Sequence, residues 1–124
     1  ARLQALRARI DATAAGREVA LLAVSKTRSA DEVRALAAAG QRSFGENYVQ
    51  EAIAKREALA DLALTWHLIG PLQSNKCREA ARTFDWVETI DRPKLVPLLA
   101  RHRPADAAPL EVLIQVNIDD EASK

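Results

Sequence analysis

The chain has little of what several classes of protein require. Its 124 residues include one cysteine and two histidines, so no intrachain disulfide can form and a zinc site would lack ligands. Eighteen basic residues against seventeen acidic ones leave a formal charge of +1, which gives no electrostatic reason to expect a nucleic acid or an anionic membrane as partner. No apolar run approaches the roughly 20 residues of a membrane span. A single cysteine makes a reducing compartment, the cytoplasm, the expected location.

The composition that is present is that of a small globular domain. Hydrophobic residues make up 48% of the chain and charged residues 28%, and a chain of this length can bury one modest core. The sequence opens on Ala1 rather than on methionine and stops at Lys124, so we expect an incomplete protein.

Short apolar runs alternate with amphipathic segments along the sequence. The spacing of Leu3, Leu6 and Ile10 predicts an amphipathic helix over the first fifteen residues. The continuous apolar run 19–24 is typical of a strand covered on both faces, and polar residues follow it. Further strands are predicted at 43–44, 64–69, 86–90 and 112–118.

Helix start signals lie between the predicted strands. Ser29 and Glu32 form a capping box for a helix that should bury Val33, Leu36 and Ala37 and stop at Gly40. Asp91 is expected to cap the helix after the fourth strand. The result is five strand–helix units, which are typical of a parallel sheet.

Two architectures fit five such units. One is a complete, five-stranded, doubly wound sheet, which this length suits and which the pattern alone favours. The other is the first five units of a (β/α)8 barrel, which typically needs about 250 residues and would here be truncated. Both place functional residues at the carboxyl ends of the strands.

Lys26 is the first candidate for chemistry. It directly follows a predicted buried strand, where low-dielectric surroundings can lower the pKa of an amine and make it nucleophilic toward carbonyl groups. A solvent-facing lysine whose stem lies on apolar surface fits the same position. The pattern therefore allows a Schiff base on Lys26 without requiring one.

Asn47 is the second candidate, in the segment Phe44-Gly45-Glu46-Asn47-Tyr48. Glycine lets a ligand approach the backbone closely, and Asn47 offers a donor and an acceptor where the strand gives way to a helix. A glycine turn with Asn47 as helix N-cap explains the same residues and is the commoner case.

His67 and Ile69 form the third candidate pair. Alternation along the predicted strand 64–69 places both on one face. Ile69 can wall a flat heteroaromatic ring and His67 can hydrogen-bond beside it, although a lone strand histidine is more often a satisfied core residue. The helix start Ser74-Asn75-Lys76 can bind an anion, although capping alone explains Ser74.

Together these segments resemble the pyridoxal phosphate homeostasis protein family. The matching stretches, in order, are residues 22–27, 44–51 and 67–76, followed by 116–118 and the terminal Ser123-Lys124. Several motifs in register are a specific signal, and they span nearly the whole chain.

The resemblance implies a fold, a cofactor and a set of contacts. The fold is a (β/α)8 barrel related to the N-terminal domain of alanine racemases, which favours the truncated barrel over the complete sheet. Pyridoxal 5′-phosphate (PLP) is then held as a Schiff base on Lys26, with Asn47, His67 and Ile69 on or near the cofactor rim. The implied role is vitamin B6 homeostasis without an established catalytic turnover, and the expected partners are PLP and PLP-requiring apoenzymes.

The resemblance also implies that part of the site lies elsewhere. In the family, backbone amides and small residues after the late strands hold the phosphate, and an arginine there faces the pyridine nitrogen. That sequence is absent, so residues 1–124 are expected to form the N-terminal half of one barrel domain, with unpaired strand edges. Either another chain supplies the missing strands or the chain is a fragment.

Two enzyme classes share a reactive lysine with this reading. A fold-type III racemase or decarboxylase needs a further β-domain, and racemases carry a Tyr-Gly-His cluster soon after the lysine, where this chain has Thr27-Arg28-Ser29. A barrel aldolase does not predict the segment 44–47. We therefore expect a cofactor-binding protein rather than an enzyme.

Overall fold

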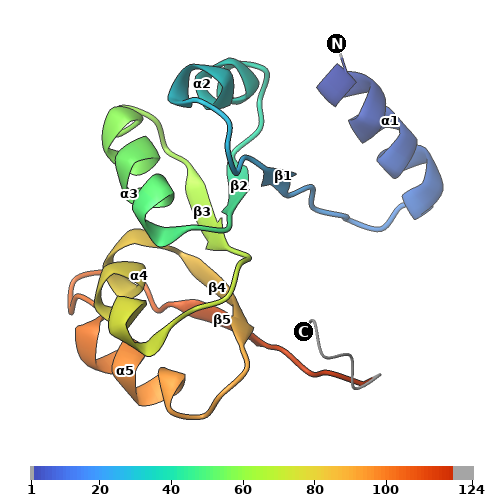
Figure 1. Ribbon diagram of the computed structural model, residues 1–124. Coiled ribbons are helices and arrows are strands. Elements are labelled where there is room, and N and C mark those ends of the chain that lie inside the picture. Colours follow the sequence, from blue (N-terminus) through green and yellow to red (C-terminus); the bar gives the residue numbers. More distant parts are fainter. Residues whose placement is uncertain (1, 119–124) are drawn as a thin grey trace.

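The computed structural model describes residues 2–118, in which strands and helices alternate (Figure 1). The strands are β1 (Ala23–Val24), β2 (Ser43–Glu46), β3 (Thr65–Leu68), β4 (Trp86–Ile90) and β5 (Glu111–Ile114). The helices are α1 (Arg2–Ala14), α2 (Ala30–Ala38), α3 (Val49–Ala58), α4 (Cys77–Thr83) and α5 (Leu95–His102), with a 3₁₀ turn, η1 (Ser74–Lys76), before α4.

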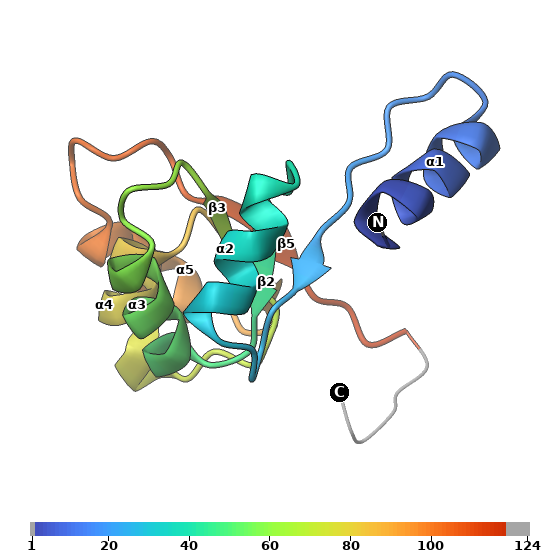
Figure 2. The ribbon, with the colours of Figure 1, turned by 90° about the horizontal axis from the view of Figure 1, so that it is seen from above.

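The strand order identifies the architecture. Within residues 2–118 the five strands form one parallel sheet in chain order, β1-β2-β3-β4-β5. Helices α2 to α5 lie on one side of this sheet in both views (Figures 1 and 2). A doubly wound sheet would reverse its strand order and carry helices on both faces. The alternative of a doubly wound sheet is therefore wrong, and the expected barrel-type arrangement is confirmed.

The hydrophobic core lies between the sheet and its helical layer. Trp66 and Leu68, at alternate positions of β3, are buried with Phe44 of β2, whose ring centroid lies 5.9 Å from that of Trp66. Leu95 and Leu99 bring the apolar face of α5 to the same cluster. In β3 every second side chain thus goes to the core, and the others are left for the opposite, inner face.

The two outer strands are shorter than the apolar runs predict. The predicted strand 19–24 is regular only over β1, and Val19 and Val24 are 49% and 55% exposed. The predicted strand 112–118 ends at residue 114. In the described chain each of these strands has a hydrogen-bonded neighbour on one side only. An apolar run extends as a strand only as far as a partner supplies hydrogen bonds.

The helix predictions are confirmed in part. Ser29 and Glu32 make the expected capping box, with hydrogen bonds in both directions. Leu36 is 36% exposed rather than buried. The buried residues of α2 are Val33 and Ala37, at i, i+4 spacing, so only a narrow stripe of the helix faces the sheet. Asp91 is not the cap of α5, which begins after Lys94; the Asp91 carboxylate lies 3.5 Å from the Arg92 guanidinium instead.

Helix α1 lies apart from the other helices (Figure 2). The Arg7 guanidinium donates to Gln41 Oε1 at 2.5 Å, and Gln4 donates to the Ala39 carbonyl. The helix forms as predicted, but its apolar Leu6 is 44% exposed. In the described range, none of the helices is both long and apolar enough to span a membrane.

Truncating Leu68 should destabilise the fold far more than truncating Leu6. Leu68 is fully buried, so Leu68→Ala is expected to lower the free energy of unfolding by about 2–5 kcal/mol. For the exposed Leu6 on α1, Leu6→Ala should change it by only about 0.5 kcal/mol. Urea unfolding measures both, and equal losses would contradict the proposed position of the core.

Candidate cofactor-binding site

The carboxyl ends of β1, β2 and β3 bring the predicted site segments to one edge of the sheet. Val24 pairs with Gly45, and Gly45 pairs with His67. Just past the strands, the Ser25 amide donates to the Gly45 carbonyl and the Ile69 amide donates to the Glu46 carbonyl, each at 2.9 Å. The loops that carry Lys26, Asn47 and Ile69 therefore leave the sheet side by side.

Ile69 lies directly over Gly45. A Cβ atom built on Gly45 would lie 2.9 Å from Ile69 Cδ1 and 3.4 Å from Leu22 Cδ2. Because Phe44 and Glu46 point into the helical layer, alternation puts these contacts on the inner face. The absence of a side chain at residue 45 lets Leu22 and Ile69 form a close apolar surface against the strands.

Asn47 holds a polar oxygen at the same edge. Its Oδ1 atom is buried and has no hydrogen-bond partner among residues 2–118. The expected alternative role, N-cap of the following helix, is wrong, because Tyr48 occupies that position and no side chain caps the helix. A buried carbonyl oxygen left unpaired costs about 1–3 kcal/mol, so this atom is suited to accept a hydrogen bond from a ligand.

Two neighbours hold the His67 ring, one at its edge and one against its face. Its Nδ1 atom lies 2.8 Å from Glu88 Oε1, and its ring stacks on Trp86 with centroids 5.4 Å apart and planes 8° apart. Trp86 is also the register partner of His67 on β4. Sequence reasoning missed Trp86 and Glu88, although alternation along β4 places both on the inner face.

Lys26 differs from these residues in being exposed. Within the described residues its side chain makes no hydrogen bond or ion pair. It lies in a turn in which Thr27 adopts a left-handed conformation, with φ +64°. The Lys26 amine is therefore available to an incoming carbonyl group.

A buried cluster of charges lies next to this turn, and we call Ser25, Glu46, Glu51 and Lys55 the Lys55 cluster. The Lys55 ammonium donates to the Ser25 carbonyl at 2.5 Å, to Glu46 Oε2 at 2.9 Å and to Glu51 Oε1 at 2.8 Å. The Ser25 hydroxyl also donates to Glu46 Oε2, and the Thr27 amide donates to Glu51 Oε1. Sequence reasoning missed the cluster; its only local signal is the i, i+4 spacing of Glu51 and Lys55.

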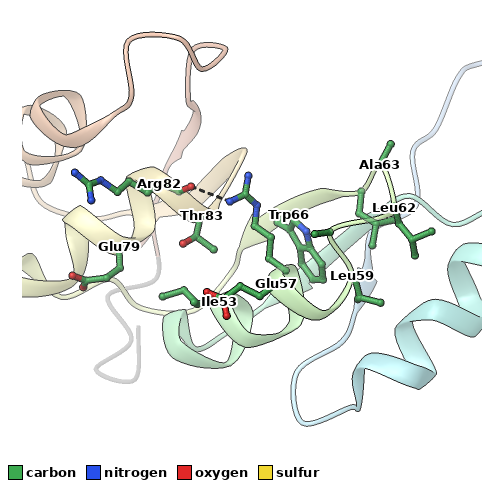
Figure 3. A pocket seen from close by; sticks show the side chains of 12 residues that line it. Ile53, Glu57, Leu59, Leu62, Ala63, Trp66, Glu79, Arg82 and Thr83 are labelled. Atoms are coloured by element: carbon green, nitrogen blue, oxygen red, sulfur yellow. Dashed lines mark hydrogen bonds between the residues drawn. The ribbon is translucent and has the colours of Figure 1, made fainter.

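Of two cavities in the described chain, the smaller is lined by a predicted site residue and the larger is not. One of about 300 Å³ lies at the rim and is lined partly by Asn47, Tyr48 and Lys76. A larger one of about 550 Å³ lies between α3 and α4, beside the loop before β3, where Arg56 donates to the Arg82 carbonyl (Figure 3). The larger cavity is lined by none of the four predicted site residues. In residues 2–118 no three metal-ligating side chains come together.

Comparison with known proteins adds to this geometry. The family model of the alanine racemase N-terminal domain matches residues 1–121. The chain belongs to that family. Within the alanine racemase-type family, the chain is 55% identical over 123 residues to the pyridoxal phosphate homeostasis protein of Pseudomonas aeruginosa, a match that covers 97% of this chain and 54% of that protein.

Solved structures agree with this family assignment. PipY of Synechococcus elongatus, solved with PLP bound, matches with a TM-score of 0.68 and 49% identity over 77% of this chain and 46% of PipY. An unknown protein from Bifidobacterium adolescentis matches with a TM-score of 0.83 and 37% identity over 98% of this chain and 55% of its own. The resemblance inferred from the motifs is confirmed, and the chain spans about half the length of the curated relatives it matches.

Glu51→Gln should show a pH-dependent loss of stability. The hydrogen bond from Lys55, helped by the Thr27 amide, holds the pKa of the Glu51 carboxyl below its ordinary value of 4.5. A carboxyl whose pKa is lowered by folding contributes stability above its ordinary pKa and loses it as the pH falls through its folded pKa. We expect Glu51→Gln to lower the free energy of unfolding by up to about 1 kcal/mol at neutral pH.

Urea unfolding across the acidic range measures this gap, which should narrow as the pH falls below 4.5 and close once the pH is below the lowered pKa of the folded protein. Glu57→Gln is the matched control, because Glu57 is exposed on the same helix; it should differ little from the wild type at every pH. A gap for Glu51→Gln that persists in acid would show that the loss is not electrostatic.

Proposed function

We propose that the chain forms the N-terminal half of a PLP-binding barrel domain that holds PLP through Lys26 and serves vitamin B6 homeostasis. The observation that carries the proposal is the combination of three groups at one edge of the sheet. The Lys26 amine there is exposed and unbonded, the buried Asn47 oxygen has no partner among the described residues, and Ile69 offers an apolar surface. The similar proteins support the proposal, because they include a pyridoxal phosphate homeostasis protein and PipY solved with PLP bound.

The residues present fit the chemistry of PLP. When bound, PLP supplies an aldehyde that condenses with a primary amine. Lys26 provides the amine, and Ile69 over Gly45 provides a flat apolar contact for the pyridine ring. Asn47 and His67 are the polar side chains that would orient the ring, and the Glu88 carboxylate fixes the imidazole that does so.

The half-barrel proposal is supported by the two sheet edges. Among the described residues β1 and β5 each pair on one side only. On β5, Val112, Leu113 and Ile114 are 43%, 49% and 74% exposed, although long apolar edges are normally covered in folded proteins. Further strands of a barrel would cover both edges, and the greater length of the relatives leaves room for such strands. We place the phosphate cradle in that part of the barrel.

We propose binding rather than turnover for this site. Racemisation and decarboxylation on PLP need acid–base groups placed on the reacting carbon. The segment after Lys26 lacks the Tyr-Gly-His cluster of racemases. A holder of PLP needs only the amine, the apolar surface and the orienting contacts.

Borohydride reduction of the complete protein with PLP should label Lys26. The Lys26 amine is exposed and unbonded, so it reacts, and reduction makes the link permanent for peptide mass mapping. Lys26→Ala should lose the label, and the matched variant Lys76→Ala at the rim should keep it. Label found mainly on Lys76 or Lys124 would overturn the assignment.

Residues 1–124 alone should bind PLP much more weakly than the complete protein. Charge-assisted hydrogen bonds to phosphate contribute about 1.5–3 kcal/mol each, so losing two of them predicts binding at least about a hundredfold weaker. Titrating both proteins with PLP under one buffer condition measures the ratio. Comparable affinities would place the phosphate contacts within residues 1–124 and would contradict the half-barrel proposal.

A further inference from the structure

The Lys55 cluster has a geometry that suits positioning of the Lys26 turn. Resting on the proposed role of Lys26, we infer that Lys55, Glu46 and Glu51 are positioning residues that lock this turn and so aim the Lys26 amine at the cofactor. None of the three touches the aldehyde; they act through the backbone on either side of Lys26.

Lys55 is the hub of the cluster. Its ammonium has three N–H donors, and three acceptors surround it, from the end of β1, from β2 and from its own helix. The Lys55 side chain is 7% exposed and that of Glu46 is fully buried. A lysine whose protons are all donated in a buried site is a poor nucleophile, so the cluster also directs an aldehyde to Lys26 rather than to Lys55.

The turn is held on both sides of Lys26. On one side, the Ser25 carbonyl accepts from Lys55 and the Ser25 hydroxyl donates to Glu46. On the other side, the Thr27 amide donates to Glu51 at 2.5 Å. Thr27 has a φ of +64°, a conformation that residues other than glycine seldom adopt. The bond to Glu51 therefore holds a backbone geometry that the chain would otherwise leave readily.

Stability alone does not explain the cluster. Apolar side chains of similar volume often replace buried ion pairs with no loss of stability. Glu46 Oε1 is buried without a hydrogen-bond partner among residues 2–118, which is an unfavourable arrangement for a purely structural carboxylate. What the charges provide, and apolar groups cannot, is directional bonds to the Ser25 carbonyl and the Thr27 amide.

Glu51 is the member to vary, because its side chain is partly exposed and its loss should leave the protein folded. Glu51→Ala removes the acceptor of the Thr27 amide, whereas Glu51→Gln keeps an oxygen in place. In the complete protein we expect condensation with PLP to slow roughly tenfold in Glu51→Ala, and borohydride label to spread from Lys26 to other lysines. Glu51→Gln should recover most of the rate and the selectivity, and Glu57→Ala should match the wild type.

Hydrogen exchange at the Thr27 amide provides a readout that needs no cofactor. It should be roughly tenfold faster in Glu51→Ala than in the wild type, while amides of β4 keep their protection. Unchanged hydrogen exchange at the Thr27 amide in Glu51→Ala would overturn the positioning role. So would an unchanged rate of condensation with PLP together with an unchanged share of the borohydride label on Lys26. If the wild type itself takes no label at Lys26, the proposed function fails, and the exchange measurement still decides whether the cluster holds the turn.

Discussion

The ammonium of Lys55 joins the parts of the chain on which the site depends. It binds the end of β1 through the Ser25 carbonyl, the end of β2 through Glu46 and the first turn of α3 through Glu51. Each acceptor comes from a different element, so one side chain sets the spacing of two strands and the helix that covers them. Removing one partner of a buried ion pair typically costs about 3–5 kcal/mol, which makes this the most sensitive point of the rim.

The two faces of the sheet have different roles: one packs against the helices and the other is left open. Side chains that alternate toward the helices, such as Phe44, Trp66 and Leu68, form the core. Side chains on the inner face, such as Ile69 over Gly45 and His67 on Trp86, form a surface that the described helices leave open. In a barrel-type fold this face meets the carboxyl ends of the strands, where ligands bind. The Lys26 turn stands at the carboxyl end of β1, where the Lys55 cluster holds it.

Much of this arrangement could be predicted because it is local. The capping box of Ser29, the bounds of β4 and the alternation that puts His67 and Ile69 on one face all depend on residues a few positions apart. The choice between sheet and barrel could not be made from the pattern, because periodicity does not encode strand order. Partners distant in sequence were also missed, since Lys55 meets Ser25 across 30 residues and His67 meets Glu88 across 21.

A crystal structure of the complete protein with PLP tests the central claim most directly. The account predicts a continuous covalent link from Lys26 to the cofactor at the carboxyl ends of β1 to β3, with Ile69 against the ring and Asn47 and His67 at its edge. The Lys55 ammonium should remain bonded to Ser25, Glu46 and Glu51. Cofactor bound instead in the cavity between α3 and α4, or attached to another lysine, would contradict it.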